Sequence, residues 1–157
     1  MLSERKKLVP ALAPAADRFD GDPETRVISM AQAEEITFLV YHDGGTTGKA
    51  TITVEACDDF TPSNVSAIPF RYRKRKTGGE YDEPQESLGT ATAAGTDTTP
   101  AVEEVVEVYV NARDLPDGYP NVRLCLDEAA DDPVSGCVLA ELDGVRYPGL
   151  VQDSVLS

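Results

Sequence analysis

The sequence of 157 residues contains no tryptophan, one histidine and three cysteines. It has no Cys-x-x-Cys pair, and no apolar segment approaches the ~20 residues of a membrane-spanning helix. Zinc-ligand spacing, a phosphate-binding loop and a dinucleotide fingerprint are also missing. These absences argue against zinc enzymes, nucleotide-dependent enzymes and helical membrane proteins. We therefore expect no cofactor and no metal.

His42 is the single histidine, and it stands where an apolar run gives way to Asp43 and two glycines. We expect it to be an exposed turn residue. A Ser–His–Asp site on His42 and Asp43 would need a distant nucleophile, and no G-x-S-x-G elbow supplies one. We predict no catalytic residues and no enzymatic activity.

The cysteines, Cys57, Cys125 and Cys137, are odd in number and widely spaced. Each lies in or beside an apolar run, which favours small buried hydrophobic residues in a reducing compartment. A Cys125–Cys137 bridge across neighbouring strands is the alternative.

Acidic residues outnumber basic ones by 28 to 14, which gives a net charge of −14. Nucleic-acid binding draws most of its affinity from basic residues that neutralise phosphates. We therefore expect no direct binding to nucleic acid or to an anionic membrane.

Period-two alternation of apolar residues runs through most of the chain between residues 25 and 145, separated by turn residues. It predicts an all-β fold, an antiparallel β-sandwich or jelly-roll-like barrel of about seven or eight strands with extended termini. Segments 34–42 and 49–57 flank a glycine-rich turn and read as a β-hairpin. The residues expected to face inward are Ile36, Phe38, Val40, Ala50, Ile52, Val54, Ala56, Val106, Val108, Val110, Val122, Leu124, Leu126, Val138, Ala140 and Leu142.

The expected organisation is an extended N-terminal arm over 1–23, a domain over 24–147 and a tail over 148–157. Residues 77–101 are rich in Gly, Thr and Ala and predict a long loop or excursion. The first 19 residues resemble a secretory signal in outline, but Pro10 and Pro14 interrupt the apolar stretch. We expect an arm there instead.

Residues 71–76 carry five positive charges in an otherwise acidic chain. In an extended strand, Arg71, Arg73 and Arg75 share one face, with Tyr72 on the other. One interpretation is a docking stripe in which arginines bind carboxylates of an acidic protein. The alternatives are an edge strand protected by charge, or internal pairing with the acidic residues of segment 80–86.

Three stretches, TVEACDD, AIPFRYR and LPDGYP, together with the opening LVPALAPAADRF, carry a family resemblance. The chain resembles small virion structural proteins of tailed bacteriophages and prophages, encoded near the major capsid protein. The resemblance implies a head decoration or cement protein, made in the bacterial host cytoplasm and placed on the capsid exterior. It implies no set of functional residues.

With that role, the partner is the major capsid protein lattice, bound by a homo-oligomer, a trimer or dimer. An ordered arm needs a surface that buries its apolar groups. The residues expected to bind the partner are Arg71, Tyr72, Arg73, Arg75, Leu8, Val9, Leu12 and Phe19.

Two other functions stay open. One is a tail, head–tail connector or fibre-base component of the virion. The other is a carbohydrate-binding or calcium-dependent adhesion module, with tyrosines as a sugar platform or carboxylates as a calcium cage. The candidate tyrosines are Tyr72, Tyr81, Tyr109, Tyr119 and Tyr147, and the candidate carboxylates are Asp58, Asp59, Asp127, Glu128, Asp131 and Asp132.

Overall fold

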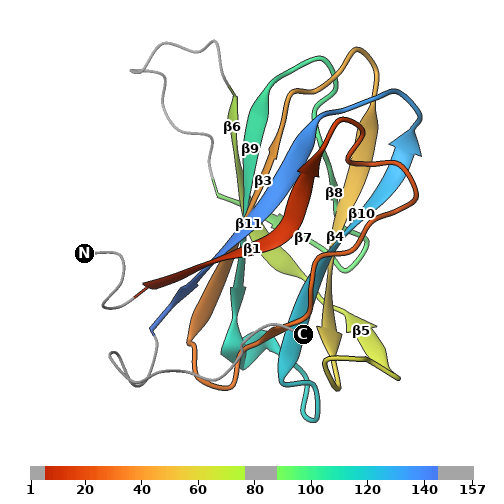
Figure 1. The fold of residues 1–157 in the computed structure, drawn as a ribbon. Helices are drawn as coiled ribbons and strands as arrows, with labels where there is room; N and C mark the ends of the chain where they lie inside the picture. Colours follow the sequence, from red (N-terminus) through yellow and green to blue (C-terminus); the bar gives the residue numbers. More distant parts are fainter. Residues whose placement is uncertain (1–5, 77–87, 145–157) are drawn as a thin grey trace.

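The computed structural model describes residues 6–76 and 88–144, and these form two β-sheets packed face to face (Figure 1). The six-stranded sheet has the order β1-β11-β3-β9-β6-β7. The five-stranded sheet has the order β2-β10-β4-β5, with β8 also paired to β4. The strands are β1 (Lys6–Ala15), β2 (Ile28–Ser29), β3 (Glu35–His42), β4 (Lys49–Cys57), β5 (Val65–Ala67), β6 (Phe70–Lys76), β7 (Gly89–Ala91), β8 (Thr96–Asp97), β9 (Glu104–Asn111), β10 (Asn121–Ala130) and β11 (Gly136–Asp143).

All strand pairs are antiparallel, so the predicted antiparallel β-sandwich is confirmed. The described residues hold more strands than the seven or eight expected. The additional ones are β1, which lies in the segment predicted as an extended arm, and the short strands β5, β7 and β8, which have three, three and two residues. Runs this short carry too little alternation to stand out in a sequence.

The core lies between the two sheets and is built from the inward-facing residue of each alternating pair. Every residue predicted to face inward is buried, and Ile36, Phe38 and Leu124 have no exposed surface. Burying one such side chain contributes about 1.5–3 kcal/mol. β3 lies between β11 and β9 in the interior of its sheet.

The hairpin predicted over residues 34–57 is wrong. β3 belongs to the six-stranded sheet and β4 to the five-stranded sheet, so the segment between them crosses the sandwich. Gly44 lies in this crossing segment at φ +80°, and it approaches Val102 so closely that a Cβ would lie 2.3 Å from the Val102 nitrogen. Alternation shows which face of a strand is buried, but a strand in either sheet buries its inner face equally well.

The predicted N-terminal arm is part of the sandwich over its described length. β1 pairs along β11 as an edge strand, and residues 16–27 then cross to the edge of the other sheet (Figure 1). Phe19 lies on this crossing and is 1% exposed. Backbone hydrogen bonds fix the crossing, including Arg18 N to Val134 O at 2.7 Å.

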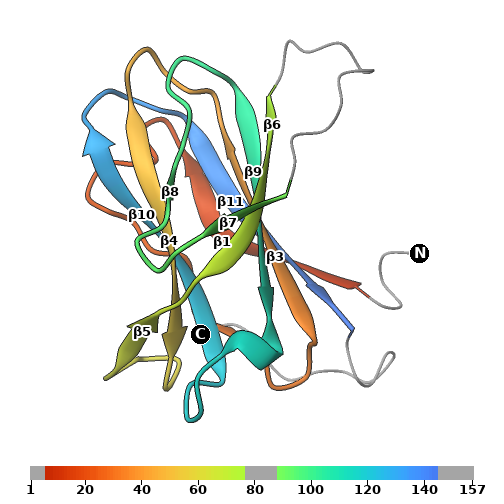
Figure 2. The ribbon, with the colours of Figure 1, turned by 180° about the vertical axis from the view of Figure 1, so that it is seen from behind.

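The predicted excursion over 77–101 contains β7 and β8 in its described part. β7 extends the six-stranded sheet beside β6, whereas β8 pairs with β4 in the other sheet (Figure 2). This segment therefore links the two layers. A 3-10 helix, η1 (Ala112–Asp114), is the only helix in the described part of the chain, and it is far too short to cross a membrane.

Candidate functional site

The outer face of the six-stranded sheet is the candidate site. Strand register aligns outward side chains in rows that cross β1, β11, β3, β9 and β6. One row contains Leu8, Glu141, Thr37, Tyr109 and Arg71; the next contains Pro10, Leu139, Leu39, Glu107 and Arg73; the third contains Cys137, Tyr41, Val105 and Arg75. The centre of this face combines apolar residues with Thr37 and the ion-paired carboxylates of Glu141 and Glu107, and its β6 side is basic.

The basic side is the predicted column of Arg71, Arg73 and Arg75 on β6. Internal ion pairs partly neutralise it. Arg75 Nε lies 2.9 Å from Glu107 Oε1, and Arg71 Nη2 lies 3.9 Å from Glu35 Oε2. The side chains of Arg71 and Arg75 are still 51% and 45% exposed. The internal pairing predicted with residues 80–86 lies outside the described residues.

Tyr72 faces away from this column. It is partly buried against the core, and its ring packs edge-to-face with Phe70 at 6.3 Å. Its predicted role in partner binding is therefore not supported by its position.

The apolar residues predicted for the arm separate into two groups. Leu8 is 55% exposed on the outer face, on the same face as the arginine column. Val9 and Phe19 are buried in this protein's own core, and Leu12 packs against it. These three side chains pack within the protein itself, because alternation along β1 turns Val9 inward and the crossing carries Phe19 between the sheets.

Sequence reasoning missed Tyr41 and Leu139, which are 44% and 36% exposed on the outer face. The signal was present, because β3 and β11 alternate apolar residues on both faces. Burial on both faces is the usual meaning of such a run, so only the finished sandwich shows that one face is open.

A pocket of about 520 Å³ opens at one end of this face. It lies where β1 bulges away from β11, at the register shift between Leu12 and Ala15. Its lining residues are Pro14, Ala15, Ala16, Tyr41, Asp43, Ser135, Gly136 and Cys137.

Three side chains of the pocket lining form hydrogen bonds within the protein. Asp43 Oδ1 accepts from Gly45 N and Ser135 N at 3.1 and 3.0 Å. Ser135 Oγ donates to Ala16 O at 3.2 Å, and Tyr41 Oη donates to Glu103. The hydrogen bond to Glu103 is the main reason that the pKa of Tyr41 is raised, so this phenol stays neutral. The surface offered to an occupant is mainly apolar.

His42 is not the exposed turn residue that was expected. It is 1% exposed, and its Nε2 lies 3.0 Å from Oε1 of Glu104, which is fully buried. Thr99 N also donates to Glu104 Oε1 at 2.7 Å. Burial by itself raises the pKa of Glu104, but the hydrogen bonds from His42 and Thr99 outweigh it and lower the pKa. The pair holds the β8–β9 loop against the sheet.

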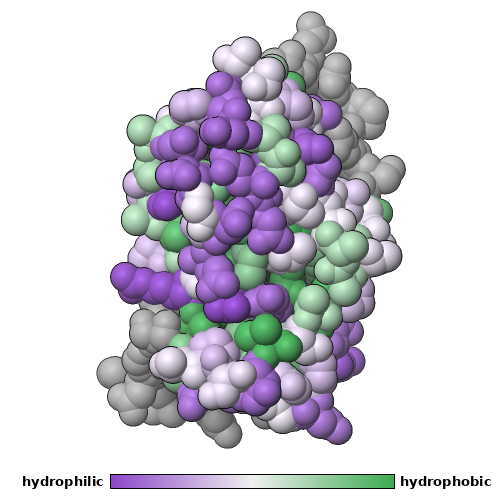
Figure 3. Space-filling view, turned by 90° about the vertical axis from the view of Figure 1, so that its right-hand side faces the viewer, coloured by the Kyte–Doolittle hydropathy of each residue, from purple (hydrophilic) through white to green (hydrophobic). Residues whose placement is uncertain are grey.

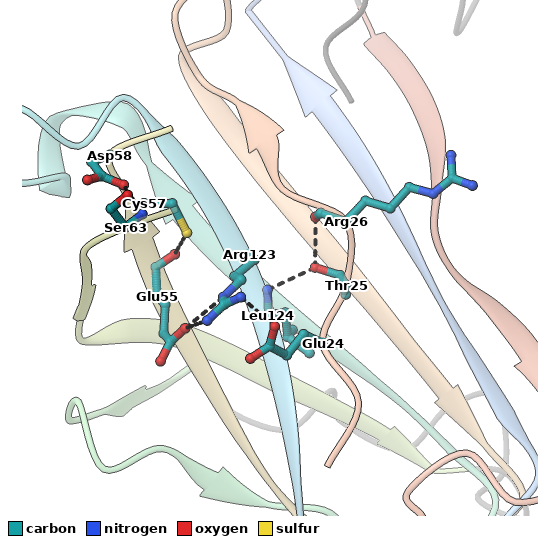
Figure 4. A network of polar contacts seen from close by, with 9 residues as sticks. All are labelled: Glu24, Thr25, Arg26, Glu55, Cys57, Asp58, Ser63, Arg123 and Leu124. Atoms are coloured by element: carbon teal, nitrogen blue, oxygen red, sulfur yellow. Dashed lines mark hydrogen bonds and ion pairs between the residues drawn. The ribbon is translucent and has the colours of Figure 1, made fainter. Parts of the chain in front are cut away.

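The outer face of the five-stranded sheet differs, because hydrophilic residues dominate it (Figure 3). Arg123 Nε and Nη2 both lie 2.7 Å from Glu55 Oε2, and Nη1 contacts Glu24 (Figure 4). Ligand atoms of Glu24, Glu55 and Cys125 lie within 4.8 Å of one another. Burial raises the pKa of the Cys125 thiol to about 12, and Arg123 already engages both carboxylates. The cluster is an ion-pair network centred on Arg123.

The cysteines are free, so the alternative Cys125–Cys137 bridge is wrong. Cys125 lies on β10 and Cys137 on β11, which belong to different sheets. Cys57 and Cys125 are buried as predicted, whereas Cys137 is partly exposed.

Two of the carboxylates considered for calcium accept hydrogen bonds from backbone amides of nearby loops. Asp132 Oδ2 accepts from Thr46 N and Thr47 N, and Asp58 accepts from Ser63 N and Asn64 N. Both therefore fix loops. Burial and the nearby carboxylates of Asp22 and Asp131 raise the pKa values of Asp127 and Glu128. Of the candidate tyrosines, Tyr109 lies on the outer face, Tyr119 packs on the core, and Tyr81 and Tyr147 lie outside the described residues.

No family model and no curated protein matches the sequence. A solved structure with a similar fold is the Clostridium thermocellum N-terminal endo-1,4-β-D-xylanase 10B, CBM22-1–GH10 modules, in complex with xylohexaose. The TM-score is 0.38 at 9% identity, over 97% of this chain and 28% of that chain.

Proposed function

We propose that this protein is a non-enzymatic virion structural protein that decorates the head lattice of a tailed phage and stabilises it. It docks through the outer face of the six-stranded sheet. The observation that carries the proposal is the position of Leu8 and the arginine column. Both were expected to dock, and both lie on one continuous face with exposed apolar residues between them.

The chemistry of this face suits an acidic protein partner. Exposed apolar area supplies the non-directional part of the attraction. Arg71 and Arg75 offer guanidinium groups that bind carboxylates with defined geometry. On a lattice, several copies in one oligomer bind together, so a modest single contact gives firm attachment. The acidic remainder of the surface limits binding elsewhere.

The test is binding to purified phage shells that lack the protein. Reversing two charges, Arg71→Glu with Arg75→Glu, should weaken binding about tenfold or more, since charge-assisted pairs contribute most when a partner desolvates them. The matched control is Arg26→Glu with Arg113→Glu, two exposed arginines outside β6. It changes the net charge equally and should bind like the wild type.

Shells that neither bind the wild-type protein nor gain heat resistance from it would end the proposal. A copy number of about a dozen or fewer per virion, rather than hundreds, would indicate a head–tail connector or a tail component instead.

Carbohydrate binding is the second candidate function, and the exposed Tyr41 beside the pocket favours it. Aromatic rings provide apolar bodies for ligands. A rise in melting temperature with neutral oligosaccharides, lost on Tyr41→Ala, would support this function over lattice binding.

A further inference from the structure

We infer that the pocket beside Tyr41 is the anchor point of the docking face and receives an uncharged apolar side chain of the protein partner. The inference rests on the proposed docking function and adds the chemistry of the partner. It predicts an apolar residue in the partner near a carboxylate that reaches Arg75.

The first argument is the chemistry of the lining. Pro14, Ala15, Ala16 and the Tyr41 ring present carbon surface, while the hydroxyl groups of Tyr41 and Ser135 are bonded within the protein. A charged group would lose hydrogen bonds to water here and gain few in return. Asp43 adds a carboxylate to the lining, which repels an anion. A neutral apolar occupant has no such cost.

The second argument is the size of the pocket. At about 520 Å³ the pocket has room for a large side chain, and it is open towards solvent rather than enclosed. A large side chain together with part of its own backbone would fill it. Buried anchors of this kind dominate the binding energy of many protein interfaces.

The third argument is charge complementarity along one row of the sheet. Cys137, Tyr41, Val105 and Arg75 follow one another in register across β11, β3, β9 and β6. Strands are spaced about 4.8 Å apart, so Arg75 lies about 10 Å from Tyr41 across the sheet. An extended partner chain covers that distance in about three residues. A partner with an apolar residue and a carboxylate at this spacing would fill the pocket and bind Arg75 together.

Arg75 is suited to this second contact. Its ion pair with Glu107 uses Nε, and 45% of the side chain is exposed. The exposed end of the guanidinium can therefore bind a further carboxylate, with two nitrogens offered in one plane.

The test fills the pocket with a bulky residue. Ala16→Trp places an indole at an exposed position of the lining. Ala129→Trp, at an exposed position on β10 of the opposite sheet, is the matched control. We expect Ala16→Trp to weaken binding to shells at least tenfold with an unchanged melting temperature, and Ala129→Trp to bind like the wild type.

A second readout does not depend on a substitution. Cys137 lines the pocket, so the rate at which N-ethylmaleimide alkylates it reports access. Docking on shells should slow this alkylation at least tenfold. Equal rates in free and docked protein would overturn the inference, as would full shell binding by Ala16→Trp.

The outcomes separate the two proposals. If the wild type binds shells and reversal at Arg71 and Arg75 weakens binding while Ala16→Trp does not, the pocket inference fails and the docking function stands. If the wild type does not bind, the docking function fails. Protection of Cys137 by neutral oligosaccharides, or by raising the concentration of free protein, would assign the pocket to a glycan or to a second copy and overturn the inference.

Discussion

His42 and Glu104 lie directly opposite each other on β3 and β9 and form a buried pair with 3.0 Å between Nε2 and Oε1. The ring of Phe19 packs edge-to-face against His42 at 5.6 Å. Among the described residues, His42 Nδ1 and Glu104 Oε2 have no hydrogen-bond partner. The pair therefore joins two strands, the β8–β9 loop and the N-terminal crossing at one end of the core.

We predict that breaking this pair is costly and that replacing it is not. Glu104→Ala should lower the free energy of unfolding by about 3 kcal/mol, because it leaves His42 buried without its partner. The double change His42→Phe with Glu104→Leu should cost much less, since apolar groups of similar volume need no partner. Urea unfolding of His42→Phe, Glu104→Leu and the double variant measures the coupling free energy between the two residues. Additive single effects would show that the two residues do not act as a pair.

The pair also predicts loss of stability in acid. The folded-state pKa of Glu104 is lowered below its ordinary 4.5, so the unfolded state takes up the proton first. The contribution is complete above pH 4.5 and is lost as the pH falls through the folded-state pKa. Asp97 acts in the same direction, because hydrogen bonds from Lys49 and Thr51 lower its pKa. Unfolding free energies measured between pH 7 and pH 3 should fall more steeply for the wild type than for the His42→Phe, Glu104→Leu variant.

Thiol chemistry should single out Cys137. Burial raises the pKa values of Cys57 and Cys125 to about 11 and about 12, so neither forms the reactive thiolate near pH 8. We expect N-ethylmaleimide to label one thiol per folded chain and three after denaturation, as counted by mass spectrometry. Cys137→Ser should remove the native label. Rapid native labelling of a second cysteine would contradict the burial of β4 and β10.

The N-terminal segment should be required for stability. Phe19→Ala removes a ring that is 1% exposed and should lower the free energy of unfolding by about 3–5 kcal/mol. Leu8→Ala is the control, because Leu8 is 55% exposed and its truncation should cost less than about 0.5 kcal/mol. Thermal and urea unfolding of both variants checks this. Equal stability of the two would mean that residues 16–27 are a detachable arm after all.

The burial pattern was predictable because alternation is a local property. Ile52 and Val54 could face only one way once Thr51 and Thr53 faced the other. The partner of each strand was not predictable in the same manner. β3 and β4 read as a hairpin, yet they lie in different sheets, because either sheet buries the same side chains at similar free energy.

The candidate site shows the same division. The arginine column followed from alternation within β6. β1 lies in the segment predicted as an extended arm, so the sequence did not separate the exposed Leu8 from the buried Val9. That the arginine column and Leu8 lie on one face, with Tyr41 and Leu139 between them, depends on the strand order β1-β11-β3-β9-β6. The pocket depends on the bulge in β1, and no local sequence pattern predicted that bulge.

The sequence by itself determined an all-β chain, the inward-facing residues of its long alternating strands and the face of β6 that carries the arginines, because the two-residue period acts within each strand. Only the tertiary structure decided that His42 and Phe19 are core residues and that β1 completes a sheet. Those outcomes depend on contacts between residues far apart in the chain, such as His42 with Glu104, and the free energy of such contacts is set by packing rather than by local pattern.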